Sequence, residues 1–477
     1  MALLRHSGIY FLARILAGGA GFAIIASYTR LLDPHQFGVL ALLLAGVGFF
    51  TAVVADTPTL ALLRFMPDRS AAARATMLWG LMLPAAALCG AFMVAVLILA
   101  PPHWRVALAA SAGLLLVSLL HKFQLATAQG TLKPVQYAML GSLESILDMV
   151  LGIALVWLGY GVAGAIIGAI LGALVTLALN WRGWWIGRAF FDPALAKQML
   201  RFGLPLVASA LFGWLATFAD RWLLGFFSGA SDTGLYAAGY DLQMNLLGLP
   251  MAVIQLAAYP LTISALTERG TQAAQQQLRA VGAFMALIML PEAVGMVMIA
   301  PLLAEIFLGA EYRPLTLLLL PLLVCATMLK ALIAYLNYGF FLAARTDITL
   351  IAIAAAAAVN LALNLVLIPR YGPWGAAIAS LAGFGAGFVV AAIKMKGVFA
   401  FPLPDPVVLL AAIFGVGAMT LWLWPFYGAT ALSAAFYIVP VAILIDFGVV
   451  LLVLYVTGRK PFVLLRGLWS EQTKRAV

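Results

Sequence analysis

Ten ionisable side chains lie inside long apolar runs of this 477-residue sequence, where a charge is costly to bury. Moving a charged side chain to the centre of a bilayer costs roughly 2.5–3.5 kcal/mol on insertion scales. Such residues are therefore expected to face one another, a bound ion or a hydrated cavity. Acids in such a place can carry a proton or a cation, and bases can bind an anionic group. The ten residues are Arg14, Asp56, Glu144, Asp148, Asp220, Arg221, Asp241, Glu292, Lys330 and Asp446.

Two of the acids, Glu144 and Asp148, are four positions apart, which places both on one face of a helix. Neighbouring carboxylates repel each other unless one holds a proton or a cation bridges them. We therefore predict that this pair, together with Glu292 in the second half of the chain, binds a coupling ion, either H⁺ or Na⁺. The sequence indicates no other cofactor and no structural metal.

The basic residues are predicted to bind an anionic substrate, because guanidinium and ammonium groups pair with phosphate oxygens. Acids on the same runs or on the runs next to them are assigned to the same site. The predicted substrate-binding residues are Arg14, Arg221, Lys330, Asp56, Asp220 and Asp241.

The depth of each side chain within its run indicates its partners, at about 1.5 Å of rise per residue. Arg14 and Asp56 lie at matching depth on consecutive runs. Asp220 and Arg221 are adjacent and point about 100° apart on a helix, which leaves Asp241 as the predicted partner of Arg221. The alternative, that these charges form structural ion pairs without contact to a substrate, stays open.

The sequence contains no arrangement that is typical of an enzyme. Its four histidines form no metal-binding spacing, and none accompanies a nucleophile. One of them, His121 beside Lys122, is predicted to lie at the membrane interface. No glycine-rich loop precedes a Lys-Ser or Lys-Thr pair, so ATP is not expected to supply energy directly. A protein without catalytic activity is predicted.

The elements that position these charges are predicted to be hydrophobic helices. The chain is 65% apolar and 9% charged, whereas soluble domains carry roughly a quarter charged residues. Fourteen runs are long enough to span a bilayer, which predicts an all-α polytopic membrane protein. The predicted spans are residues 7–29, 37–60, 76–100, 104–125, 135–158, 161–180, 202–227, 234–262, 279–300, 314–344, 347–368, 373–393, 406–425 and 429–456.

The net charge of +10 is distributed unevenly between the two sides of these spans. With the N-terminus in the cytoplasm, 20 of the 27 Lys and Arg residues fall on the cytoplasmic side, four in outer loops and three within spans. This split is typical of the positive-inside rule for an even number of spans with both termini in the cytoplasm. Topology thus explains the positive charge, and no nucleic-acid partner is expected.

The sequence repeats in halves. Arg5 precedes Gly38 by 33 residues, and Arg201 precedes Gly234 by the same distance. The repeat predicts two six-helix lobes in the same orientation, related by a pseudo-twofold axis along the membrane normal. The predicted organisation is an N-terminal lobe at 1–180, an amphipathic cytoplasmic linker at 181–201, a second lobe at 202–393, and two extra helices with a cytoplasmic tail at 394–477.

Two local patterns predict how particular helices begin and pack. The segment "LLDPHQFG" (31–38) predicts a helix start capped by Asp33 with Pro34 in its first position. A seam of small residues predicts that the span at 161–180 packs closely on a neighbour. The seam consists of Gly161, Gly164, Gly168 and Gly172.

Four segments carry a resemblance to a known family: "RLLDPHQFGVLAL" (30–42), "FGLPLVASAL" (202–211), "DRWLLGFFSGASDTGLYAAGYDL" (220–242) and "NLALNLVLIPRYGPWGAAIAS" (360–380). They resemble the polysaccharide-transport branch of the multidrug/oligosaccharidyl-lipid/polysaccharide exporter superfamily, the Wzx-type flippases for O-antigen and exopolysaccharide repeat units. The resemblance covers about residues 1–456. Its most distinctive part is the Asp-Arg pair followed by Gly-x-Tyr.

The resemblance implies two lobes around a central cavity that opens alternately to each side of the membrane. Spans 1, 2, 7 and 8 would line this cavity and form lateral gates. It also implies a flippase that carries an undecaprenyl-pyrophosphate-linked oligosaccharide to the outer leaflet of the bacterial plasma (inner) membrane. Arg14, Arg221 and Lys330 would hold the pyrophosphate. The two extra helices resemble the pair that forms a lipid-tail groove in lipid II flippases. Membrane lipids, a polysaccharide polymerase and chain-length proteins are the implied partners.

Other functions stay open. A multidrug/cation antiporter of the same superfamily usually has twelve spans and an acid in the first span, where this chain has Arg14. A peptidoglycan lipid II flippase is a further alternative. A membrane polymerase or ligase would need a long outer loop, which the sequence lacks, and a scaffold without transport would need no cavity.

Overall fold

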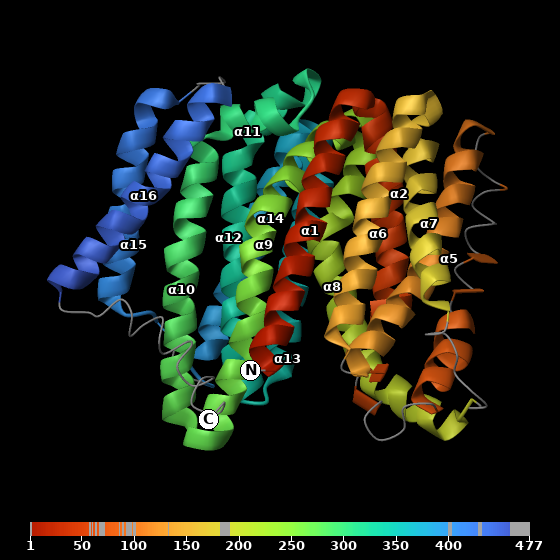
Figure 1. Cartoon of the computed structure of the whole chain (residues 1–477), viewed down its shortest axis with the longest axis horizontal. Coiled ribbons are helices and arrows are strands. Elements are labelled where there is room, and N and C mark those ends of the chain that lie inside the picture. Colours follow the sequence, from red (N-terminus) through yellow and green to blue (C-terminus); the bar gives the residue numbers. More distant parts are fainter. Residues whose placement is uncertain are drawn as a thin grey trace. The chain divides into compact units, whose positions relative to one another are not determined.

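The computed structural model describes residues 2–56, 72–84, 102–131, 133–181, 191–398, 403–427 and 432–457, with short pieces between positions 59 and 98. Some side chains within these ranges, including those of 2–14 and 56, lie outside the description. Every described element is helical (Figure 1). The longer helices are α1 (Ala2–Leu31), α2 (Pro34–Thr51), α5 (Pro102–Gly130), α6 (Pro134–Leu155), α7 (Gly161–Leu179), α8 (Pro193–Phe227), α9 (Ala230–Arg269), α10 (Thr271–Met298), α11 (Ala300–Phe307), α12 (Arg313–Leu342), α13 (Thr346–Tyr371), α14 (Pro373–Met395), α15 (Pro406–Leu423) and α16 (Leu432–Val456). The shorter ones are the π-turns η1 (Ala52–Asp56), η2 (Thr76–Met82) and η3 (Val156–Tyr160) and the 3-10 turns η5 (Ala310–Tyr312) and η6 (Trp424–Phe426).

The prediction of an all-helical, multi-pass membrane protein is confirmed. Among the described residues, nine helical segments are long and apolar enough to cross a bilayer, or ten if α8 is counted as one span. α8 bends by 44° between its segments Pro193–Gly203 and Val207–Phe227. The described helices match the predicted spans closely, and the short α11 was not predicted. The total of fourteen spans and the cytoplasmic position of both termini stay predictions, because about half of residues 57–101 lie outside the described part.

The chain forms two compact units. The N-terminal unit is Arg5–Ala237, and the C-terminal unit is Ala238–Val477 with Met1–Leu4. The boundary falls inside α9, so α8 and the first turns of α9 belong to the N-terminal unit. The predicted lobes follow the sequence repeat instead, and their boundaries stay predictions. Residues 182–190 of the predicted linker and the tail beyond 457 lie outside the described residues.

In the N-terminal unit, α7 packs on α6 through glycine, as the spacing predicts (Figure 1). A Cβ atom on Gly168 would overlap the backbone of Gly152, and one on Gly172 would lie 2.8 Å from the amide nitrogen of Asp148. The helices are joined by η3, where Gly159 has a φ of 93°, a conformation that side chains rarely adopt. This backbone-to-backbone contact leaves the other faces of α6 for α1 and α5.

α2 begins as the sequence predicts. The Asp33 carboxylate accepts a hydrogen bond from the Gln36 amide at 2.8 Å, and Pro34 occupies the first position. The cap satisfies an N–H group that the start of a helix would otherwise leave unpaired. α2 then continues into η1, which ends at Asp56.

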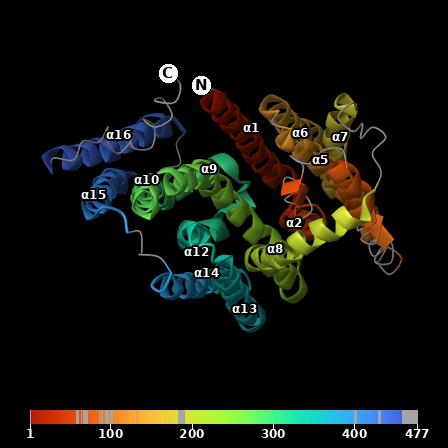
Figure 2. The same ribbon diagram turned by 90° about the horizontal axis from the view of Figure 1, so that it is seen from below.

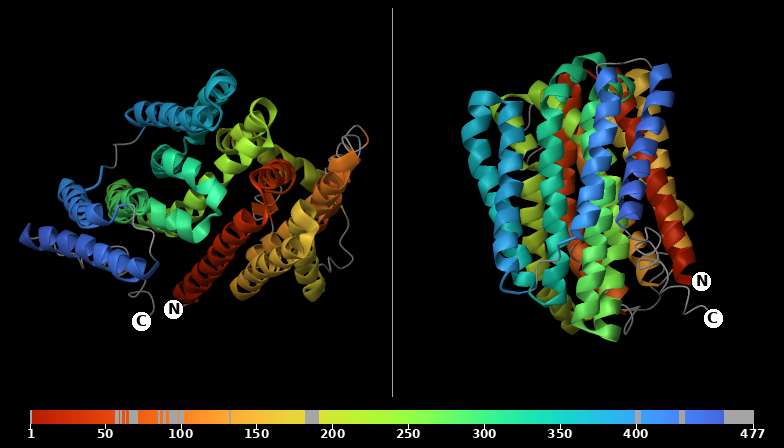
Figure 3. Two further views of the ribbon diagram at one scale, coloured as in Figure 1. Left: turned by 90° about the horizontal axis from the view of Figure 1, so that it is seen from above. Right: turned by 90° about the vertical axis from the view of Figure 1, so that its left-hand side faces the viewer.

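In the C-terminal unit, α14 packs on α12 and α13, α10 packs on α15, and α15 packs on α16. These neighbours can be followed in Figures 2 and 3 by the colours of the chain. A buried apolar cluster joins α10, α12, α13 and α14 through Leu278, Phe340, Ile348 and Met395. Ala331, next to Lys330 on α12, belongs to this cluster, and Met328 packs against it.

A polar ladder links α13 to α14. The Asn364 side-chain amide donates to Asn360 Oδ1 at 3.0 Å, and the Asn360 amide donates to Ser380 Oγ at 3.3 Å. All three side chains are buried. Buried amides are tolerated because they bond to one another, so the ladder specifies how these two helices pair.

Asp446 on α16 lies against α15. The residue is 2% exposed, and its Oδ1 has no hydrogen-bond partner among the described residues. A Cβ atom on Gly415 would fall 2.5 Å from that oxygen. The glycine therefore makes room for the carboxylate between the two extra helices.

Candidate functional site

Asp220 and Arg221 lie near the end of α8 and are both buried, with 1% and 5% of their surface exposed. The Tyr236 hydroxyl on α9 donates to Asp220 Oδ2 at 2.5 Å, and the Arg221 backbone amide donates to Asp220 Oδ1 at 2.8 Å. Tyr236 is itself fully buried. A buried carboxylate needs hydrogen-bond donors to be stable. Tyr236 thus holds Asp220 in place and ties α8 to the start of α9.

Arg221 makes a contact of a different kind. Its guanidinium carbon lies 5.3 Å from the centroid of the Phe218 ring, within the range of a cation–π interaction. The predicted pairing of Arg221 with Asp241 would join the two units, and it stays a prediction. Guanidinium groups carry N–H donors suited to phosphate oxygens, and the role of Arg221 in substrate binding stays a prediction.

α2 and α9 cross beside this pair at two glycines. A Cβ atom on Gly38 would overlap the carbonyl of Ala230, and one on Gly234 would overlap the carbonyl of Pro34. Gly38 and Gly234 are equivalent in the sequence repeat, and so are Pro34 and Ala230. Equivalent residues that contact each other reciprocally are the mark of a twofold axis through the contact. The crossing lies within the N-terminal unit, and the pseudo-twofold relation of the two lobes stays a prediction.

An aromatic cluster fills the seam between α2 and α8. Trp214 lies 5.0 Å from Phe49 and 4.8 Å from Trp222, measured between ring centroids. The indole N–H of Trp222 donates to the Leu42 carbonyl at 3.3 Å. Aromatic pairs at these separations stabilise beyond the area they bury. The cluster holds the segment that carries Asp220 and Arg221 against α2.

The predicted coupling residues Glu144 and Asp148 lie on one face of α6. His121 from α5 and Tyr28 from α1 lie close to them. His121 on α5 places its Nδ1 3.9 Å from Glu144 Oε1. A Cβ atom on Gly152 would overlap the Tyr28 hydroxyl and lie 3.6 Å from Asp148 Oδ1. The Tyr28 hydroxyl from α1 and the Asp148 carboxylate therefore both lie beside Gly152. The structure brings all these polar groups together in the N-terminal unit.

The remaining described candidates lie in the C-terminal unit. Glu292 on α10 has its Oε2 buried without a hydrogen-bond partner among the described residues. The Lys330 ammonium on α12 lies 5.7 Å from the centroid of the Phe384 ring. The Asp241 carbonyl accepts a hydrogen bond from the Asn245 side chain at 2.9 Å. A role in substrate binding or ion coupling stays a prediction for each of the three candidates.

Two predicted site residues lie outside the described side chains. Arg14 belongs to α1 and Asp56 to η1, and only their backbones are described. Their predicted pairing at matching depth stays a prediction.

Residues 28–317 match the family model described as polysaccharide biosynthesis protein. The chain belongs to this family. The match includes α2, α6, α8 and the start of α9, so it contains Asp220, Arg221 and Tyr236. The resemblance drawn from "DRWLLGFFSGASDTGLYAAGYDL" is confirmed.

Solved structures show which fold this polysaccharide biosynthesis protein has. It is similar to the lipid II flippase MurJ in an inward closed conformation, with a TM-score of 0.74 and 12% identity over 95% of this chain and 98% of that one. It is also similar to an inward-facing multidrug resistance MATE family transporter of the MOP superfamily (TM-score 0.51, 18% identity, 81% and 95% covered). A MOP superfamily transporter from Pyrococcus furiosus matches with a TM-score of 0.52 and 17% identity, covering 83% and 96%. No curated protein sequence is detectably similar to the chain.

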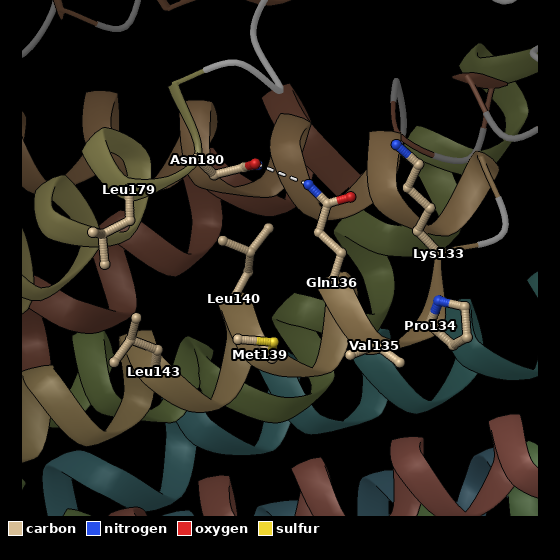
Figure 4. Close-up of a pocket in the computed structure, with 9 residues that line it drawn as sticks. All are labelled: Lys133, Pro134, Val135, Gln136, Met139, Leu140, Leu143, Leu179 and Asn180. Carbon is tan, nitrogen blue, oxygen red and sulfur yellow. Dashed lines mark hydrogen bonds between the residues drawn. The ribbon is translucent and has the colours of Figure 1, made fainter.

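A pocket of about 690 Å³ opens between the start of α6 and the end of α7 in this polysaccharide biosynthesis protein (Figure 4). Its lining is mostly apolar, with Lys133 at one end. The Gln136 side-chain amide donates to Asn180 Oδ1 at 2.8 Å across the pocket (Figure 4). None of the predicted site residues lines it.

Sequence reasoning selected Asp220, Glu144 and Asp148 as candidate site residues, but it did not identify the residues that lie against them. His121 was expected at the interface, and the structure buries it to 4% exposure beside Glu144. Tyr236 was part of the Gly-x-Tyr motif without a role. Tyr28 gave no sequence signal, because one tyrosine near the end of an apolar helix is typical of an interfacial residue.

Proposed function

We propose that this protein is a flippase that moves a polyprenyl-pyrophosphate-linked oligosaccharide from the cytoplasmic to the outer leaflet of a bacterial plasma membrane. The observation that carries the proposal is the polysaccharide biosynthesis match over a chain with the fold of membrane flippases and transporters. The substrate would be an O-antigen or exopolysaccharide repeat unit carried on undecaprenyl pyrophosphate. A polysaccharide polymerase and chain-length proteins would receive it, and no catalytic step is involved.

The proposed mechanism is alternating access driven by an ion. A pyrophosphate carries charge that must be neutralised inside the membrane, and Arg14, Arg221 and Lys330 would supply the cations. Arg221 is supported by its buried position and its aromatic contact, which leave its donor edge fixed in direction. Asp220 and Asp241, with Asp56, would bind polar groups of the same substrate.

The driving ion would be bound by acids away from the substrate cations. Glu144 and Asp148 share one face of α6, and the Oε2 atom of Glu292 is buried in α10. Release of H⁺ or Na⁺ down its gradient would favour one conformation over the other by the difference in ion affinity between them.

The test is transport of a defined probe by the full chain in proteoliposomes. The probe is a fluorescent polyprenyl-pyrophosphate disaccharide, and its arrival in the protected leaflet is measured by resistance to dithionite. Loss of one charge-assisted contact of about 1.5–3 kcal/mol in Arg221→Gln predicts roughly ten- to hundred-fold slower flipping. The control is Arg345→Gln, which removes an exposed cation that pairs with Asp347 in the turn between α12 and α13. Equal rates in both variants would remove Arg221 from the site.

A lipid II flippase is the second candidate, favoured by the coverage of the MurJ match. Replacing the disaccharide of the probe with the pentapeptide-bearing disaccharide of lipid II separates the two. Faster flipping of the lipid II probe would assign the chain to peptidoglycan rather than to polysaccharide export.

A further inference from the structure

His121 is a buried titratable group that the proposed function does not use. It is 4% exposed on α5, and its Nδ1 lies 3.9 Å from Glu144 Oε1. The backbone of Leu140 is also within hydrogen-bonding reach of the imidazole. Histidine is the side chain best suited to exchange protons near neutral pH, and here a carboxylate is fixed beside one of its nitrogens.

The other nitrogen of the imidazole has a candidate acceptor on the same helix. His121 Nε2 and Gln124 Oε1 are both buried and have no hydrogen-bond partner among the described residues. Residues three apart share a face of a helix. The Gln124 amide nitrogen points to the carbonyls of Leu177 and Asn180, at 3.4 Å each. His121 Nε2 and Gln124 Oε1 are thus not bonded to each other, and the oxygen is the end of Gln124 that can accept a hydrogen bond from a water molecule between them.

Gln124 leads from His121 to the pocket at the end of α6 and α7. Asn180, whose carbonyl Gln124 contacts, lines that pocket together with Gln136 and Lys133 (Figure 4). Leu140 lines it as well. Leu140 and Asn180 thus link the surroundings of the imidazole to a pocket of about 690 Å³, whose polar groups are those of Lys133, Gln136 and Asn180.

On the opposite side of Glu144, the polar groups continue toward α1. Asp148 is one turn further along α6, and the Tyr28 hydroxyl occupies the space that a side chain at Gly152 would need. Tyr28 is 5% exposed. At about 1.5 Å per residue, His121 lies about 13 Å from the end of α5, and Gly152 about 27 Å from the start of α6. The groups from His121 to Gly152 thus extend over about 14 Å, roughly half of a hydrocarbon core of about 30 Å.

We propose that His121, Glu144, Asp148 and Tyr28 form a proton path inside the N-terminal unit, and that the pocket at Lys133, Gln136 and Asn180 is its mouth on the cytoplasmic side. The path rests on the proposed coupling of transport to an ion, and it names the ion as H⁺. Along α1, α5 and α6, the other ionisable residues within two helical turns of these four residues are Lys122, Tyr137 and Arg30. α7 has none between Gly161 and Leu179.

The proposed proton transfer makes and breaks only O–H and N–H bonds. Protonated Glu144 gives its O–H proton to the bare Nδ1 of His121, and the imidazolium releases the proton on Nε2 to a water molecule that enters from the pocket. One proton enters the imidazole and one leaves, so the ring returns to the neutral state as its other tautomer. Glu144 is then refilled from Asp148, whose carboxyl receives its proton beside the Tyr28 hydroxyl.

The first test measures protonation of Glu144 without any substrate. Dicyclohexylcarbodiimide reacts with protonated carboxyl groups in apolar surroundings, and the labelled peptide of the purified full chain is quantified by mass spectrometry. Whenever His121 holds the proton of the path, the imidazolium beside Glu144 favours the unreactive carboxylate. His121→Gln removes that charge while keeping a side-chain amide, so labelling of Glu144 should rise about ten-fold. His35→Gln is the control, because His35 is exposed at the start of α2.

The second test compares driven with passive flipping of the fluorescent disaccharide probe. His121→Gln should equilibrate the probe between leaflets at the wild-type rate without a pH gradient, and should lose the acceleration that a pH gradient gives the wild type. Unchanged labelling of Glu144, or retained acceleration in the variant, would overturn the path. If the variant lost both passive flipping and thermal stability, the path would also be overturned, since His121 would then be structural. If wild-type protein flips no probe, the proposed substrate fails, and the labelling alone decides the path.

Discussion

The glycine crossing of α2 and α9 gives the sharpest prediction about stability. In Gly38→Ala the new methyl would overlap the Ala230 carbonyl, and in Gly234→Ala it would overlap the Pro34 carbonyl. Backbone cannot rotate aside as a side chain can, so the upper end of the overpacking range applies, about 3 kcal/mol. The higher helix propensity of alanine returns about 1 kcal/mol. Each single substitution should therefore cost about 2 kcal/mol.

The double substitution tests whether the two clashes share one gap. Because each methyl forces the same two helices apart, Gly38→Ala with Gly234→Ala should cost little more than either alone. The coupling energy should thus be about 1–2 kcal/mol, well above the 0.5 kcal/mol or so of independent sites. The free energy of unfolding is measured by titrating the purified protein with SDS in mixed micelles. Gly213→Ala on α8 is the control, since no atom lies within 4 Å of its new methyl. Additive costs, or single costs equal to that of the control, would refute the close crossing.

Three further substitutions test other contacts by the same titration. Tyr236→Phe should cost about 1.5–3 kcal/mol by removing the donor to Asp220, and no loss would mean that another donor satisfies the carboxylate. Gly415→Ala should cost about 1–3 kcal/mol by placing a methyl on the Asp446 oxygen. The double variant Gly415→Ala with Asp446→Ala should regain the lost free energy of unfolding. If it does not, the new methyl clashes with a group other than the Asp446 carboxylate. Trp214→Ala should cost about 3–5 kcal/mol and reduce tryptophan fluorescence energy transfer within the cluster; a cost under about 1 kcal/mol would show that the cluster contributes little.

The helices and the acids of the site could be predicted from sequence because both are local signals. Apolar runs give the spans, and acids at positions 144 and 148 must share a face whatever surrounds them. The glycine seam of α7 was also predicted, since its spacing has one structural meaning. The neighbour of each face could not be predicted, because periodicity fixes a direction around one helix and says nothing of which helix lies there. The burial of His121 depends on the packing of α5 on α6, and the bond from Tyr236 to Asp220 depends on the turn between α8 and α9.

The glycines of α6 and α7 explain why a proton bound in the N-terminal unit would act on α1. Gly152 is pressed by the backbone of α7 through Gly168 on one side and by the Tyr28 hydroxyl on the other. Helices in backbone contact cannot move closer, and they lose many contacts if they separate. When Asp148 gains or loses its proton, its attraction for the Tyr28 hydroxyl changes. Because α6 and α7 are held together, α1 is the helix that moves in response. The resemblance to polysaccharide flippases assigns this helix to the lateral gate. In the proposed mechanism, the rigid glycine seam thus directs the effect of protonation to the helix that has to move.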